Sequence, residues 1–150
     1  MDEYTFEELS AKTAVAANNL DLKPGQEEFV VPPSFEAASL TGDQGLTWAG
    51  VVLCNTEVVG LVRAIFDENA SSELFESCLL RIAVDADWQG KGVGKFAISN
   101  LVSEAKRRGF SFIRTVWEAG DMGPGDFFTR IGFTPVGETE YGETIGEIQV

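Results

Sequence analysis

Hydrophobic residues in this chain gather in short runs of strand length that alternate with polar turns. The runs at 48–54 and 57–66 flank Asn55-Thr56, a pattern typical of a β-hairpin. Further strands are predicted at 4–9, 75–84, 110–117, 133–137 and 143–150. Residues 26–31 could form either a short strand or a helical turn.

Helical spacing is strongest after residue 92, where apolar residues fall on one face of a helix that Gly109 would end. The residues on this face are Val93, Phe96, Ala97, Leu101, Val102 and Ala105. Residues 11–19 and 35–40 each follow a serine that can cap a helix. A short helix is predicted between Pro124 and Gly132.

Length and composition narrow the class of protein. The chain has 150 residues, of which 44% are apolar, and this predicts one globular domain over residues 1–150. No run of about 18 apolar residues is present, so no membrane partner is expected. The acidic N-terminus lacks the layout of a signal peptide, which predicts a cytoplasmic protein with Cys54 and Cys78 reduced in the core.

Charge and residue usage exclude several functions. The net charge of −13 argues against nucleic acid as a partner, because nucleic-acid recognition depends on a basic surface. Surplus acid either attracts a cationic small-molecule substrate or only keeps the protein soluble. The chain contains no histidine, which excludes a histidine base or a histidine-ligated metal, and no metal is expected.

The most informative stretch runs from residue 79 to residue 95. Its apolar first half, 79–84, is typical of a strand buried on both faces, and Gly90, Gly92 and Gly94 then lead into the amphipathic helix. Glycines let the backbone approach a ligand closely, and the free N–H groups and dipole of a first helical turn favour an anion. This order predicts a phosphate-binding turn, the alternative being a glycine-rich turn that holds no ligand.

The spacing distinguishes between phosphate motifs. A Walker loop requires Ser or Thr after its lysine, but Phe96 follows Lys95, and the dinucleotide fingerprint requires a third glycine where Lys95 stands. The pattern Gln89-x-x-Gly92-x-Gly94 instead resembles the pyrophosphate-binding motif of the GNAT superfamily, which consists of acyl-CoA-dependent N-acetyltransferases.

The resemblance extends over nearly the whole chain. The segment Phe-x-x-Ile-Gly-Phe at 128–133 is similar to the Tyr-x-x-x-Gly-Phe segment that lies beside acetyl-CoA in the superfamily. The order of predicted elements also matches. The resemblance implies a single-domain α/β (α+β) GNAT-like fold, with a mixed, mostly antiparallel central sheet and helices on both faces, and a possible homodimer.

Within the superfamily, the chain most resembles the bacterial spermine/spermidine (diamine) acetyltransferase type. The matching positions are Leu20, Leu22, Pro24, Gln26, Phe29, Val30, Arg81, Gln89 to Gly92, and Gly142-Glu143. This likeness implies the fold and the cofactor more firmly than the substrate, because acceptors vary through loops.

The resemblance also implies which residues would hold acetyl-CoA. The backbone of Ile82, Ala83 and Val84 would hydrogen-bond the pantetheine arm, and the glycine turn would hold the pyrophosphate. The residues of that turn are Gln89, Gly90, Lys91, Gly92, Val93, Gly94 and Lys95. The two lysines either add charge or are simply solvated. Trp117 and Glu118 would line the slot for the acetyl group, and Phe128 would lie beside acetyl-CoA, although Trp117 could instead be an ordinary core aromatic.

Catalytic residues are less clearly indicated. Phe128 stands where the superfamily usually has the tyrosine that protonates the departing thiolate. Tyr141 is a substitute candidate, and solvent or another group is the alternative. Glu76 and Glu118 are candidate bases or amine-binding carboxylates, and each could instead be a surface carboxylate.

The leading interpretation is an acetyl-CoA-dependent N-acetyltransferase that acts on a primary amine of a small molecule, possibly a polyamine. Attack would be direct, in a ternary complex, because no Cys or Ser stands in a nucleophile motif. One alternative is a protein acetyltransferase that modifies lysine or an N-terminus. The other is a non-catalytic GNAT module that binds acyl-CoA.

Overall fold

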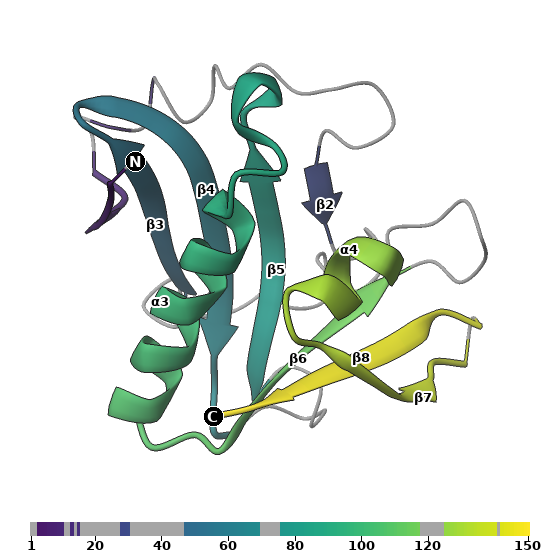
Figure 1. Ribbon diagram of the computed structural model, residues 1–150. Helices are drawn as coiled ribbons and strands as arrows, with labels where there is room; N and C mark the ends of the chain where they lie inside the picture. The colour runs from purple at the N-terminus through teal and green to yellow at the C-terminus, as the bar shows by residue number, and fades with distance from the viewer. Residues whose placement is uncertain are drawn as a thin grey trace.

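A computed structural model describes residues 3–10, 13, 15, 28–30, 47–69, 76–117, 125–140 and 142–150, and its strands form one eight-stranded sheet (Figure 1). The strands are β1 (Tyr4–Glu8), β2 (Glu28–Val30), β3 (Thr47–Cys54), β4 (Glu57–Phe66), β5 (Ser77–Val84), β6 (Phe112–Trp117), β7 (Thr134–Glu138) and β8 (Thr144–Gln149). The helices are a 3₁₀ turn at Ala86–Trp88, α3 (Val93–Arg107) and α4 (Gly125–Arg130).

The sheet is mixed and mostly antiparallel, with the order β1-β3-β4-β5-β6-β8-β7, and β2 pairs with β5 beside this path. β5 and β6 are its parallel neighbours, as expected for two strands joined by a crossover helix. Their pairing has one register position, Cys78 opposite Arg114, near the start of both strands. Beyond it, β5 and β6 diverge toward their carboxyl ends (Figure 1).

The mostly apolar sequence of β5, which only Ser77 and Arg81 interrupt, is explained by burial on both of its faces. Leu79 and Ile82 belong to the main core cluster, which they share with α3 and α4. Leu80 and Ala83 belong to two smaller clusters. Arg63 of β4 pairs with Arg81 and Ala64 pairs with Leu79, and this β-bulge beside Leu80 explains why Leu79 and Ile82 share a face in spite of strand alternation. Both helices therefore lie over the same face of the sheet, α3 over β4 and β5 and α4 over the β6–β8 end (Figure 1).

Helix α3 buries four residues of the predicted apolar face, together with Ile98, which the sequence did not place on that face, and Phe96 and Val102 are half-buried. The four buried residues are Val93, Ala97, Leu101 and Ala105. The C-terminus of α3 is capped by backbone hydrogen bonds. The Gly109 N–H donates to the Lys106 carbonyl at 3.1 Å, and the Phe110 N–H donates to the Ala105 carbonyl at 3.0 Å. This pair of bonds is a Schellman motif, with Gly109 in the left-handed conformation at φ +88°.

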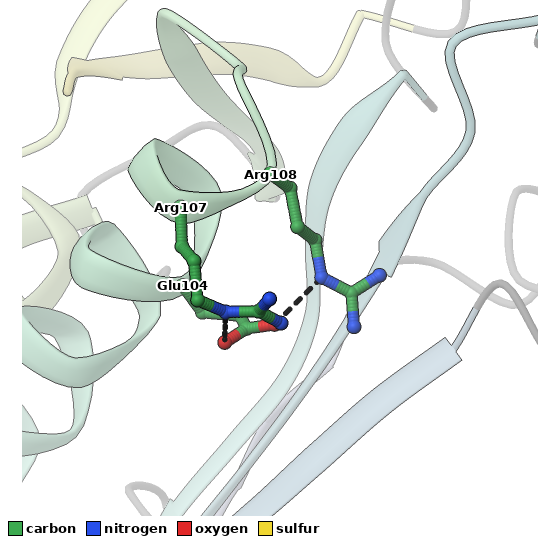
Figure 2. A network of polar contacts seen from close by, with 3 residues as sticks. All are labelled: Glu104, Arg107 and Arg108. Carbon is green, nitrogen blue, oxygen red and sulfur yellow. Dashed lines mark hydrogen bonds and ion pairs between the residues drawn. The ribbon is translucent and has the colours of Figure 1, made fainter.

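Charged side chains complete the last turn of α3 (Figure 2). The Glu104 carboxylate accepts hydrogen bonds from Arg107 Nε at 3.0 Å and from Arg108 Nε at 2.7 Å. The Arg108 guanidinium also lies 4.7 Å from the centre of the Phe66 ring. Two cations near the helix C-terminus interact favourably with the helix dipole.

The predicted fold class is confirmed. Strand β5 begins at Ser77 and strand β6 at Phe112, each two residues later than predicted. In the segment 26–31, for which the sequence left strand and helical turn open, residues 28–30 form a strand. The helices predicted at 11–19 and 35–40 fall almost wholly outside the described residues, so helices on the second face of the sheet stay a prediction. Within the described part of the chain, no helix has the length and apolar character needed to cross a membrane.

The two cysteines are free and buried, as the sequence predicted. Cys78 is fully buried, and desolvation raises the pKa of its thiol well above the ordinary value. A buried thiol of this kind is not a nucleophile at neutral pH.

Candidate functional site

The glycine turn begins where β5 ends, and hydrogen bonds tie it to both β4 and β5. The Asp85 N–H donates to the Val59 carbonyl at 2.9 Å, and the Asp87 N–H donates to Asp85 Oδ1 at 3.0 Å. Gln89 Nε2 donates to the Val84 carbonyl at 3.2 Å. The glutamine of the motif thus links the turn to the last residue of the buried strand.

Gly90 and Gly92 adopt left-handed conformations, with φ of +78° and +86°. Residues with a Cβ rarely adopt this conformation, which explains why both positions hold glycine. A Cβ placed on either residue would meet no atom within 4 Å. The backbone of the turn therefore faces open space, and a ligand can approach it closely.

The first turn of α3 presents backbone N–H groups that the helix itself does not use. The Phe96 N–H donates to the Gly92 carbonyl at 3.0 Å, so the N–H groups of Val93, Gly94 and Lys95 have no partner four residues back. Gly92 provides no capping side chain, and the first turn contains no acidic residue. Free donors at the positive end of a helix dipole form a binding site for an anion.

The predicted lysines lie beside these donors. Lys91 and Lys95 are both exposed, and they flank the N-terminus of α3. Positive side chains at this end of a helix oppose its dipole, so they are unfavourable unless an anion is bound. The Lys91 ammonium lies 5.2 Å from the centre of the Trp88 ring.

An aromatic cluster of Tyr4, Trp88 and Phe96 packs against the turn, and the sequence did not predict it. The Tyr4 hydroxyl donates to the Lys91 carbonyl at 2.7 Å. The Tyr4 ring packs against Trp88, with centroids 6.3 Å apart, and against Phe96, at 5.6 Å. Tyr4 and Lys91 are 87 residues apart, and no local pattern in the sequence signals such a contact.

The edge of β5 predicted to hold the pantetheine arm is occupied by another strand. β4 pairs along one edge of β5, so β6 and β2 share the other edge. β2 pairs there with Arg81, Ile82 and Ala83. The backbone of Ile82 and Ala83 is therefore already part of the sheet on both sides, and the assignment of this backbone to the pantetheine stays a prediction.

Trp117 and Phe128 lie together in the core. Their rings stack, with centroids 5.1 Å apart and planes 12° from parallel, and both side chains are buried. Phe127 packs edge-on against Phe128 at 5.5 Å. A Cβ placed on Gly94 would lie 3.2 Å from the Phe127 ring, so the third glycine of the motif allows α4 to approach α3. Phe128 presents no hydroxyl to donate a proton.

Of the three candidate catalytic residues, Glu76 is the one within the described part of the chain. Glu76 is half-buried just before β5, at the end of the strand opposite to the glycine turn. Eight strand residues separate it from the turn, about 26 Å at 3.3 Å per residue. Glu118 and Tyr141 lie outside the described residues. Among the residues that the structure describes, no cluster of three or more acidic or cysteine side chains could hold a metal.

One family profile matches most of the sequence. The sequence profile of the acetyltransferase (GNAT) family matches residues 14–133. A search of curated protein sequences found no significant match.

Solved structures share the fold. A GNAT family acetyltransferase from Elizabethkingia anophelis with acetyl-CoA bound has a TM-score of 0.68 and 14% identity, and 100% of each chain is covered. The ribosomal-protein-S18-alanine N-acetyltransferase from Escherichia coli has a TM-score of 0.66 and 18% identity, with 99% of this chain and 94% of the other covered. An IAA acetyltransferase from Bacillus cereus has a TM-score of 0.65 and 15% identity, covering 99% of this chain and 100% of the other.

Proposed function

Because the chain belongs to the GNAT family of acetyltransferases, we propose that it transfers the acetyl group of acetyl-CoA to a primary amine of a small molecule. The observation that carries this proposal is the start of α3, where three backbone N–H groups, two left-handed glycines and no capping side chain meet. The turn has the donors that a pyrophosphate requires.

The described residues fit the pyrophosphate of acetyl-CoA. The N–H groups from Gln89 to Lys95 would hold its oxygens, and Lys91 and Lys95 would balance its charge. A pyrophosphate would also remove the unfavourable interaction between these lysines and the helix dipole. The open space beside Gly90 and Gly92 allows the phosphates to approach the backbone.

Acetyl-CoA supplies a thioester, and a neutral amine attacks its carbonyl carbon. A C–N bond forms and the C–S bond breaks. A proton passes from the amine to the sulfur, directly or by relay. The burial of both cysteines supports direct transfer without an acyl-enzyme. Phe128 carries no proton that it could give to the sulfur. We therefore assign that proton to Tyr141 or to solvent, and the base to Glu76 or Glu118.

A polyamine is the acceptor that the charge favours. The net charge of −13 would attract a polycation, and the sequence resembles the spermine/spermidine type. A homodimer, which that resemblance also implies, remains a prediction that light scattering would test.

The experiment is a free-thiol release assay with acetyl-CoA and a panel of amines that includes spermidine and spermine. Gly92→Glu should abolish release, because it places a carboxylate where the pyrophosphate would bind. Gly109→Glu is the matched control, because Gly109 has the same left-handed conformation (φ +88°) and the same open surroundings at the other end of α3. The Gly109→Glu variant should have similar backbone strain but should retain activity.

The outcomes separate the candidate functions. Thiol release with a polyamine that persists in Gly109→Glu and disappears in Gly92→Glu supports both the activity and the cofactor site. Calorimetric binding of acetyl-CoA without release on any amine would favour a binding module, which is the role that the missing hydroxyl at Phe128 suggests. No binding of acetyl-CoA would contradict the proposal.

A further inference from the structure

We propose that Tyr4 is a positioning residue for the pyrophosphate turn: its hydroxyl fixes the Lys91–Gly92 peptide group so that the turn is preorganised for acetyl-CoA. This inference rests on the proposed function. It assigns a role to the first strand of the chain, which the sequence motifs do not include.

The argument begins with the geometry of one peptide group. The Lys91 carbonyl and the Gly92 N–H belong to the same planar unit, and in a trans peptide they point in opposite directions. Tyr4 holds the carbonyl at 2.7 Å. The Gly92 N–H is thereby directed away from Tyr4, and it adds a donor to those of the first turn of α3.

The turn needs such a restraint. Two of its residues, Gly90 and Gly92, are glycines with a wide choice of backbone conformations. Gln89 fixes the beginning of the turn through its bond to the Val84 carbonyl. Without a second restraint, the Lys91–Gly92 peptide could rotate, and ordering it on binding would reduce the affinity for the ligand.

Tyr4 is itself held in place, so its hydroxyl is a fixed point. Its backbone pairs with Cys54 of β3, which anchors it to the sheet. Its ring packs edge-on against Trp88 and at a tilt against Phe96, the two aromatic residues that border the turn. The hydroxyl therefore reaches the turn from a rigid element, which is the arrangement that preorganises a binding site.

The test is Tyr4→Phe, which keeps the ring and removes only the hydroxyl. One neutral hydrogen bond contributes a factor of about three to ten, so the Kd for acetyl-CoA, measured by calorimetry, should rise by about three- to tenfold. The kcat at saturating acetyl-CoA should not change. Thr5→Val is the matched control, because it removes the hydroxyl of the exposed neighbour on the same strand, and it should leave the Kd unchanged.

A comparison of two acyl donors distinguishes a loss of positioning at the turn from a general structural effect of Tyr4→Phe. Acetyl-pantetheine lacks the pyrophosphate, so its kcat/KM should be the same in Tyr4→Phe and in the unmodified protein. An equal loss for both donors, or an unchanged Kd for acetyl-CoA, would overturn the inference. If the unmodified protein bound no acetyl-CoA, the proposed function itself would fail, and this result is distinct from the other two.

Discussion

The two ends of helix α3 differ in how their backbone groups are satisfied. At the C-terminus, Gly109 and Phe110 close a Schellman motif, and Glu104 binds two arginines (Figure 2). At the N-terminus, Gly92 provides no cap, the first turn has no acidic residue, and Lys95 opposes the dipole. The same helix is therefore completed by its own chain at one end and left incomplete at the other.

The difference teaches what each end is for. A capped terminus contributes to stability, whereas a terminus with free donors and an unfavourable charge gives up stability that a bound anion can restore. The comparison predicts that changes at the C-terminus of α3 alter folding alone, and that changes at the N-terminus alter the binding of acetyl-CoA.

Matched charge reversals give the largest expected effect. Lys95→Glu places a negative charge beside the proposed pyrophosphate and should weaken acetyl-CoA binding at least about tenfold, less so at high salt. The same change should stabilise the free protein by about 0.5 kcal/mol, since an acidic residue suits this end of the helix. Lys106→Glu should destabilise the protein by a similar amount and leave binding unchanged. Calorimetry and urea unfolding measure the two effects, and equal Kd values in both variants would contradict the comparison.

Matched glycine substitutions come next. Gly92 and Gly109 have nearly the same left-handed φ, +86° and +88°, and a Cβ on either meets nothing within 4 Å. Gly92→Ala and Gly109→Ala should therefore each lower the free energy of unfolding by about 1 kcal/mol. Only Gly92→Ala should also raise the Kd for acetyl-CoA, because its methyl group would enter the space that the pyrophosphate needs. Weakened binding in Gly109→Ala would show that the strain spreads along the helix.

The smallest effect concerns pH. The hydrogen bond from Arg107, aided by Arg108, lowers the pKa of Glu104. A carboxylate with a lowered pKa in the folded state stabilises the protein above its unfolded pKa, and this stability is lost as the pH falls through the folded pKa. Glu104→Gln should lower the unfolding free energy by about 0.5 kcal/mol between pH 6 and 8, and the difference should shrink toward pH 4. Urea unfolding at several pH values tests this, and a difference that grows on acidification would contradict it.

What the sequence could predict followed from local chemistry. The β5 strand, the glycine turn and α3 were predictable because residues 79–109 contain their own burial pattern, turn residues and helix end. For Trp117 the sequence left a choice between core and site, since an aromatic residue in an apolar run fits both, and its stacking on Phe128 was not predicted.

Contacts between distant segments were not predictable. The bond from Tyr4 to Lys91 depends on where the edge strand β1 meets the turn, which the tertiary fold decides. Glu76 was a candidate base because it lies two residues before Cys78 on the same strand face. The structure places it at the end of β5 opposite to the glycine turn, and its role as a base stays a prediction. Strand alternation predicts the face on which a side chain lies and not the distance to a particular site.

The pairing of β2 with Arg81, Ile82 and Ala83 affects how the affinity for acetyl-CoA should be interpreted. If the pantetheine hydrogen-bonds the backbone at this edge of β5, then β2, which belongs to the same chain, competes with it for the same backbone groups. The measured Kd is then the intrinsic Kd divided by the fraction of molecules in which this edge of β5 is free. If β2 pairs with the edge in about nine molecules of ten, the affinity for acetyl-CoA is about tenfold weaker. Substitutions in β2 would then strengthen acetyl-CoA binding without adding any contact to it.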